Sequence, residues 1–260
     1  MKRNRNIGAI LLIAAGLLLM AAALYKLIPA LLAYKRADDT YEALREAYVT
    51  GQPETSSDEP AEEGEELPAW YEALRVDFET LREANPDVIG WIYFDNIEQI
   101  NYPILYSGDD ETYLHTDLYG NASKSGCIFM EGNNVPDFND CHTILYGHNM
   151  KNGSMFGTLK QYKLQETVDK SPYFWIITPD DAYKYKIFSI YTANVDGDTY
   201  TLIKGPGTET VDYGNAMKAK SNIDMGDYEF KQTDKMVTLS TCTGDSSTRF
   251  VVQGVRVDPE

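Results

Sequence analysis

The residues with the clearest chemical potential lie in "TLSTCTGDSSTRFVV", residues 238–252. Cys242 ends an apolar, strand-like run, and Arg249 opens the next such run after a polar turn. Two strands joined by so short a turn are expected to be antiparallel neighbours, which brings the guanidinium near the sulfur. A fixed cation favours the thiolate and stabilises an oxyanion formed by attack on a carbonyl. The stretch therefore predicts a nucleophilic cysteine with its own cation.

Such a thiol also needs a general acid or base, and the chain has three histidines. His148 is the best placed, because in "TILYGHNM" it follows an apolar run and a glycine that lets the chain turn. His115 lies in a polar connecting stretch and is expected at the surface, whereas His142 lies at the opposite end of the run that leads to His148. Each residue alone is weak evidence, since a free cysteine is more often simply packed in a core.

These residues must be positioned by strands, because short runs rich in Val, Ile, Tyr, Phe and Thr alternate with turn residues from Val88 onward. Eight runs have this character: 88–95, 100–106, 126–131, 142–148, 175–180, 183–193, 235–242 and 249–257. One later helix is expected over residues 211–222. Eight strands with few helices predict a mostly-β fold, a closed or nearly closed barrel of about 175 residues.

The sequence of the N-terminal segment predicts a membrane anchor. Three basic residues precede an apolar run from Ile7 to Leu24, close to the ~20 residues that cross a bilayer as a helix. The basic start keeps the N-terminus cytoplasmic, so the rest of the chain is expected outside as a single-pass type II protein. "AAALY" offers a cleavage site for the alternative, a signal peptide, but the apolar run is long for one. We expect a retained anchor over residues 1–34.

Two connecting segments are expected between the anchor and the barrel. Residues 35–68 are predicted to form a helical stalk followed by an acidic, disordered spacer with seven acids and no base over 51–68. A catalytic domain over 69–260 then begins with an amphipathic helix. That helix is predicted from apolar residues spaced by three and four, Trp70, Leu74, Phe78 and Leu81, and it ends at Asn85-Pro86.

The net charge and the number of cysteines limit the kinds of partner and of covalent chemistry that the chain can have. The formal net charge is −17, and beyond residue 36 it is −23, which argues against a nucleic-acid partner. Three cysteines in an exported chain leave at least one unpaired. Cys127 and Cys141 each begin a predicted strand, and parallel neighbours would bring them within disulfide range. The favoured alternative is two buried, reduced side chains.

The combination of "TLSTC", Arg249 shortly after it and "YGHNM" upstream resembles the sortases, the cysteine transpeptidases of Gram-positive cell surfaces. The resemblance covers roughly residues 70–257 and is closest to class B. It is supported by "INYPILY", "YGHNMKNGSMFGTLKQY", the "YKYKIFSIY" run and the helix-containing insertion before "KMVTLSTC". The implied fold is an eight-stranded sortase-type β-barrel with an N-terminal helix, preceded by a transmembrane helix.

The resemblance implies a role for each residue. Cys242 would be the nucleophile, His148 the general acid/base and Arg249 the cation that orients the substrate and stabilises the oxyanion. The thiolate would cleave the Thr–Gly-type bond of an LPXTG-like sorting signal on secreted proteins, and a peptidoglycan amine would then attack the thioacyl enzyme. No metal or cofactor is expected. Five further residues would line the sorting-signal groove: Asn101, Leu105, Tyr146, Thr192 and Ser240.

Several alternatives stay open. The acceptor amine could be a pilin lysine, and Asp245 could orient His148, although an ordinary turn aspartate is favoured. "SKSGCIFM" around Cys127 faintly resembles L,D-transpeptidases but lacks their histidine and arginine. A zinc site from Cys141, His142 and His148 matches no standard spacing. The non-enzymatic alternative is a surface-displayed binding barrel in which the cysteine, histidine and arginine are incidental.

Overall fold

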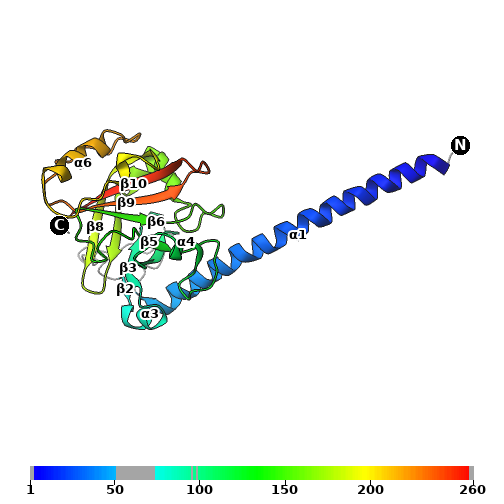
Figure 1. Ribbon diagram of the computed structural model, residues 1–260, viewed down its shortest axis with the longest axis horizontal. Coiled ribbons are helices and arrows are strands. Elements are labelled where there is room, and N and C mark those ends of the chain that lie inside the picture. Colours follow the sequence, from blue (N-terminus) through cyan, green and yellow to red (C-terminus); the bar gives the residue numbers. More distant parts are fainter. Residues whose placement is uncertain (1–2, 51–73, 95, 98, 258–260) are drawn as a thin grey trace, which may run out of the picture.

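The computed structural model describes residues 3–50, 74–94, 96–97 and 99–257. Its centre is a closed barrel of eight strands in the order β10-β8-β7-β3-β4-β5-β6-β9 (Figure 1). The predicted mostly-β barrel is confirmed, and each of the eight predicted runs overlaps one barrel strand. The strands are β3 (Val88–Tyr93), β4 (Asn101–Leu105), β5 (Ile128–Met130), β6 (His142–Tyr146), β7 (Tyr173–Ile177), β8 (Ala182–Asn194), β9 (Met236–Cys242) and β10 (Thr248–Val257).

Helices and a small ribbon lie outside the barrel. The two-residue strands β1 (Val49–Thr50) and β2 (Arg75–Val76) pair antiparallel. The late helix predicted over residues 211–222 is present as α6, which spans Thr208–Lys218. The helices are α1 (Arg3–Tyr48), α3 (Phe78–Ala84), α4 (Thr112–His115), α5 (Gln165–Lys170) and α6 (Thr208–Lys218), with 3₁₀ turns η1 (Leu159–Lys163) and η2 (Asp198–Tyr200). The predicted spacer over 51–68 lies outside the described residues.

The helix predicted before the barrel is wrong over residues 74–77 of the described chain. Helix α3 begins only after Asp77, whose side chain accepts a hydrogen bond from Thr80 N at 3.0 Å as an N-cap. The preceding residues Arg75 and Val76 form β2 instead. Leu74, Phe78 and Leu81 are all buried, as predicted. Their spacing therefore identified buried positions correctly, although the three residues do not lie in one continuous helix. Trp70 lies outside the described residues.

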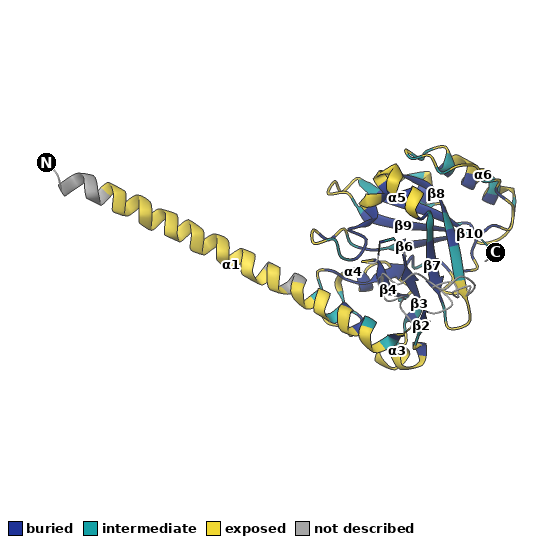
Figure 2. Ribbon diagram, turned by 180° about the vertical axis from the view of Figure 1, so that it is seen from behind, coloured by how far each residue is buried: buried dark blue, intermediate teal, exposed yellow. Residues whose placement is uncertain are grey.

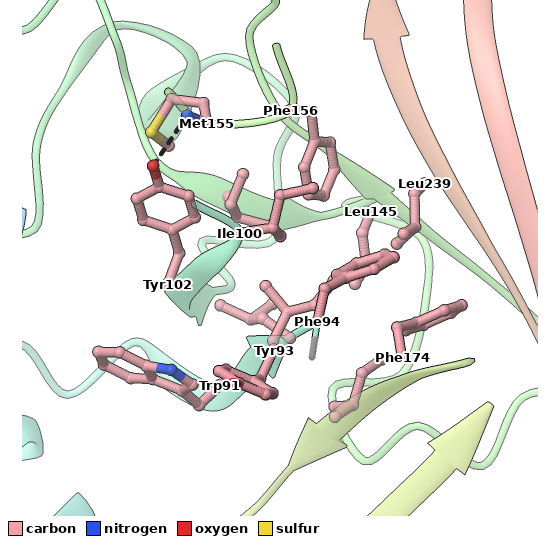
Figure 3. Close-up of a cluster of buried hydrophobic side chains, with 14 of the residues drawn as sticks. Trp91, Tyr93, Phe94, Ile100, Tyr102, Leu145, Met155, Phe156, Phe174 and Leu239 are labelled. Atoms are coloured by element: carbon pink, nitrogen blue, oxygen red, sulfur yellow. Dashed lines mark hydrogen bonds between the residues drawn. The ribbon is translucent and has the colours of Figure 1, made fainter. Parts of the chain in front are cut away.

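Alternation along β9 creates two hydrophobic cores. Val237 and Leu239 point into the barrel and pack in its main cluster, part of which is drawn in Figure 3 around the stacked rings of Phe94 and Phe174. Met236 points outward into a second cluster that α6 covers through side chains including Tyr213 and Met217. Because side chains alternate in a strand, Thr238, Ser240 and Cys242 share this outer face.

One helix is long and apolar enough to cross a membrane. The segment Gly8–Pro29 of α1 has a mean hydropathy of 2.4 and is 0% buried, and Figure 2 shows it projecting, exposed, away from the barrel. By length and composition it fits a membrane anchor or a signal sequence.

The same helix continues into the barrel domain. Tyr41 and Leu44, near the end of α1, are buried in the main cluster, and the rings of Tyr41 and Tyr102 meet edge to face at 5.1 Å. The Tyr41 hydroxyl donates to the Gly126 carbonyl at 2.6 Å. The predicted boundary at residue 34 therefore lies inside one helix, and the predicted stalk packs against the barrel.

This packing predicts a measurable contribution to stability. Leu44→Ala should lower the free energy of unfolding by about 2–4 kcal/mol, because it leaves a cavity under α1 without lowering helix propensity. The exposed neighbour Glu46 provides the matched control, and Glu46→Ala should change stability by less than about 0.5 kcal/mol. Urea unfolding of the full-length chain in detergent micelles, followed by tryptophan fluorescence, measures both. Equal effects of the two substitutions would contradict the docking of α1.

Candidate active site

Strands β6 and β9 are parallel neighbours, and their register sets the centre of the site. The pairs run from His142 opposite Met236 to Tyr146 opposite Ser240. Beyond the last pair the side-chain amide of Asn149 donates to the Cys242 carbonyl at 2.7 Å, so the two chains stay close there. His148 and Cys242 each lie two residues past that pair, at the same end of the barrel.

Gly147, directly before His148, lies in close contact with the barrel core. A Cβ at Gly147 would lie 2.5 Å from Ile128 Cδ1 and 2.7 Å from Phe156 Cδ2, inside van der Waals contact. Only glycine therefore fits against this part of the core, part of which Figure 3 shows with Phe156 and Leu145. The His148 carbonyl then accepts from Phe156 N at 3.0 Å, which folds the following loop back onto the barrel.

The short turn between β9 and β10 places the cation as predicted. Cys242 and Arg249 are direct cross-strand partners, so their side chains leave the sheet on the same face. Arg249 Nη1 donates to the carbonyls of Ser246 and Thr248, at 3.0 and 2.9 Å. These bonds anchor one corner of the guanidinium in the turn and hold the cation beside the sulfur-bearing strand.

Asp245 stabilises this turn. Its carboxylate accepts from both the backbone N and the hydroxyl of Ser247, at 2.8 and 2.7 Å. These hydrogen bonds lower the pKa of Asp245. The favoured sequence interpretation, a turn aspartate, agrees with these contacts.

Helix α4 contacts His148, a contact that the sequence did not predict. His148 Nε2 lies 2.9 Å from the carbonyl oxygen of Leu114. A carbonyl can only accept, so Nε2 carries a proton here. Leu114 reaches the histidine through its backbone, and for that reason no side-chain pattern marked it.

The 3₁₀ turn η2 borders the site from the other side. The Tyr200 hydroxyl lies 3.0 Å from Ser240 Oγ, and Ser240 is two residues from Cys242 on the same face. Burial raises the pKa of Tyr200, while its hydrogen bond to Ser240 and the charge of Arg249 oppose the shift. Tyr200 therefore lies within electrostatic reach of the Cys242–Arg249 pair, and the sequence interpretation missed it.

Three of the five predicted groove residues share one face of the sheet. Leu105 pairs with Phe129, Phe129 with Tyr146 and Tyr146 with Ser240, so Leu105 and Tyr146 lie on the same face as Ser240 and Cys242. The Tyr146 hydroxyl donates to Glu131 at 2.8 Å. Leu105 and Asn101 are both buried, and Asn101 accepts from Trp91 Nε1 at 2.5 Å.

Thr192 stands apart from the Cys242 face. It pairs with Phe250, one position from the pair of Ala193 and Arg249, so its exposed side chain leaves β8 on the opposite side from Arg249.

The other two histidines lie away from Cys242. His115 is exposed at the end of α4, as predicted. His142 is fully buried at the far end of β6, where its Nδ1 lies 2.7 Å from the Thr201 carbonyl. This placement separates His142 from His148 by the length of the strand, which leaves no common zinc site for the two.

The three cysteines are unbonded and differ in exposure. Cys127 and Cys141 are both 0% exposed, whereas Cys242 is partly exposed. The disulfide considered for Cys127 and Cys141 is wrong because β5 and β6 are antiparallel, which puts the two strand starts at opposite ends. Burial raises the pKa of Cys127 to about 12, and its hydrogen bond with Tyr41 only partly offsets this.

This difference predicts selective thiol chemistry. In the folded chain at neutral pH, iodoacetamide should alkylate Cys242 at least about 10³ times faster than Cys127, because only a thiolate reacts and Cys127 is buried and protonated. Peptide mapping by mass spectrometry measures each site. All three cysteines should react once the chain is unfolded in urea, which is the control. Modification of Cys127 as fast as Cys242 in the folded chain would contradict this assignment.

Comparison with known proteins agrees with this geometry. The sortase domain family matches residues 92–257. Sortase B of Listeria monocytogenes is 31% identical over 186 residues, covering 70% of this chain and 74% of the relative. Sortase B of Staphylococcus aureus is 30% identical over 187 residues, covering 70% of this chain and 75% of the relative.

Solved structures show the same fold. Sortase B from B. anthracis, in complex with AAEK1, has a TM-score of 0.70 and 29% identity, covering 88% of this chain and all of that one. A Staphylococcus aureus sortase B–substrate complex has a TM-score of 0.65 and 27% identity, covering 70% and 85%. The chain therefore belongs to the sortase family, in class B, and is a cysteine transpeptidase of the kind that anchors surface proteins to the cell wall.

Proposed function

We propose that this chain cleaves an LPXTG-like C-terminal sorting signal of secreted proteins and joins the cleaved protein to an amine of peptidoglycan. The observation that carries the proposal is the arrangement around Cys242. Arg249 is its cross-strand partner, and the Asn149 amide binds the Cys242 carbonyl directly beside His148. A thiol, an imidazole and a fixed cation at one rim are the groups that acyl transfer through a thioester requires.

The first half-reaction follows from these positions. The Cys242 thiolate attacks the carbonyl carbon of the scissile bond, and the developing oxyanion accepts hydrogen bonds from the Arg249 guanidinium. An imidazolium at His148 keeps one N–H on the Leu114 carbonyl, which leaves its other N–H for the departing amine. Proton transfer to that amine breaks the peptide bond and leaves a thioacyl group on Cys242.

The second half-reaction uses the same groups in the reverse sense. The neutral His148 accepts a proton from the incoming amine, the amine attacks the thioester, and Cys242 leaves as the thiolate. Both substrates must therefore reach one exposed rim. Tyr200 and Ser240 on one side and Leu114 on the other are the contacts that we assign to the walls of the peptide groove, with Tyr146 further along β6.

We also propose that α1 stays attached as a type II anchor. The apolar segment Gly8–Pro29 is long enough to span a bilayer, and the same helix continues without a break to Tyr48. At 1.5 Å per residue, the twelve steps along the helix from Pro29 to Tyr41 span about 18 Å. That distance keeps the barrel close to the outer membrane face, where secreted proteins and wall precursors are both presented.

The test is peptide cleavage by the full-length chain in detergent micelles. Quenched peptides with LPXTG-, NPXTN- and PPXTG-like signals are incubated with the protein, and mass spectrometry follows the thioacyl adduct. Cys242→Ala should abolish both adduct and cleavage, a loss of at least about 10³ in rate. Cys127→Ala, which removes a buried thiol, is the matched control and should keep both.

Addition of a peptidoglycan-derived amine should convert the adduct into an amide product, whereas a lysine-bearing pilin segment should not. Cleavage that survives Cys242→Ala and is lost with Cys127→Ala would contradict the proposed mechanism.

A further inference from the structure

His142 is a buried ionisable group with no part in the reaction proposed above. It begins β6, is 0% exposed, and lies on the outer face of the barrel beneath the insertion that carries η2 and α6. Its imidazole packs against the ring of Tyr213 from α6 with centroids 4.5 Å apart. His142 lies at the opposite end of β6 from the reacting residues.

The hydrogen bonds of His142 specify one neutral tautomer. Nδ1 lies 2.7 Å from the Thr201 carbonyl, and because a carbonyl only accepts, Nδ1 carries the proton. Nε2 lies 2.7 Å from Thr238 Oγ1 and 3.0 Å from the Tyr213 hydroxyl. Neutral Nε2 offers a lone pair to these groups.

The remaining protons agree with that assignment. The Tyr213 hydroxyl donates to the Thr199 carbonyl at 2.7 Å. The Gln253 side-chain amide donates to both Tyr213 and Thr238, at 2.9 and 2.8 Å. The Thr238 hydroxyl is then the group that donates to His142 Nε2. A second proton on the imidazole would sit on Nε2 and turn this nitrogen from an acceptor into a donor, so the Thr238 hydroxyl would lose the group to which it donates.

These contacts join the barrel to the wall of the site. Thr238 and Gln253 belong to β9 and β10, whereas Thr199 and Thr201 lie on either side of Tyr200. The backbone N of His142 also donates to the Ile203 carbonyl at 2.9 Å. Tyr200 in turn bonds Ser240, two residues from Cys242. The imidazole is thus the central group of a network that holds η2 against the strand of the nucleophile.

We propose that His142 is a positioning residue that holds η2 and Tyr200 in place beside Cys242, and that protonation of His142 releases this wall. The proposal rests on the proposed function, because the wall is assigned to the groove that holds the sorting signal. Acid would then weaken peptide binding through this wall of the groove.

The surroundings of His142 resist its protonation. Burial lowers the pKa of His142 to about 4, and the Thr201 carbonyl and the charge of Asp140 only partly oppose this. Asp140, just before β6, is the nearby anion and is paired with Lys204 at 3.0 Å. The groups that face the imidazole from α6, β9 and β10 are the uncharged side chains Tyr213, Thr238 and Gln253.

The sign of the pH effect follows. In the released state the imidazole regains the ordinary histidine pKa of about 6.5. Because the docked state binds the proton less tightly, acid favours release. The docked wall is fully stable above about pH 6.5 and loses stability as pH falls toward about 4. Within that window the ratio of released to docked wall rises about tenfold per pH unit.

Hydrogen exchange on the full-length chain in micelles tests this directly. After correction for the intrinsic rate, the opening of residues 199–203 should be about thirtyfold more frequent at pH 5 than at pH 8. His142→Gln cannot titrate and should show equal opening at both values. His115→Gln, at the exposed histidine, is the matched control and should keep the thirtyfold ratio. Tyr213→Phe removes the hydrogen bonds of the hydroxyl with Thr199 and Gln253 and should increase opening at both pH values while keeping the ratio.

The kinetic readout separates positioning from chemistry. With a cleaved peptide at neutral pH, His142→Gln should raise KM severalfold and change kcat by less than about twofold. The exchange measurement needs no substrate. If no peptide is cleaved, the proposed function is overturned, but hydrogen exchange in the parent chain and in His142→Gln still tests whether His142 holds η2 in place. A pH-dependent opening that persists in His142→Gln, or a ratio that disappears in Tyr213→Phe, would overturn the inference.

Discussion

The parallel pairing of β6 with β9 is the constraint on which the rest of the site depends. Five residue pairs hold the two strands in register, so whatever follows their ends must emerge together. At one end these residues are His148 and Cys242. At the other end His142 meets Thr238, which connects the barrel to the insertion. A slip of one residue in this pairing would turn every side chain of the slipped strand to the other face and would disrupt both ends at once.

The sequence was most informative where structure is local. Each barrel strand lies in a short run rich in β-branched and aromatic residues, so all eight could be predicted. The nucleophile and its cation are joined by a short turn, and for that reason Cys242 and Arg249 could be paired without knowledge of the rest of the fold. Helix α6 was also predicted, with bounds that differ by three and four residues.

Long-range pairing was the part that sequence could not supply. The antiparallel arrangement of β5 and β6, which separates Cys127 from Cys141, depends on the closed barrel rather than on either strand. Leu114 and Asn149 contact the site through a carbonyl and a backbone-directed amide, so residue type gave no direct signal. Nothing in "NYPIL" indicated that Asn101 and Leu105 are both buried, because their burial depends on the segments that cover this face. The docking of α1 likewise depends on a surface that only the folded barrel creates.

We expect strand register and the β9–β10 turn together to hold an acyl group on Cys242 between His148 and Arg249. A crystal structure of the chain with Cys242 covalently joined to a sorting-peptide mimic would show this arrangement. The acyl oxygen should lie within about 3.2 Å of the Arg249 guanidinium, while Nη1 keeps its bonds to the turn carbonyls. His148 should face the leaving-group side. An acyl oxygen directed away from Arg249, with the guanidinium more than about 6 Å distant, would show that Arg249 is not the group that binds the oxyanion.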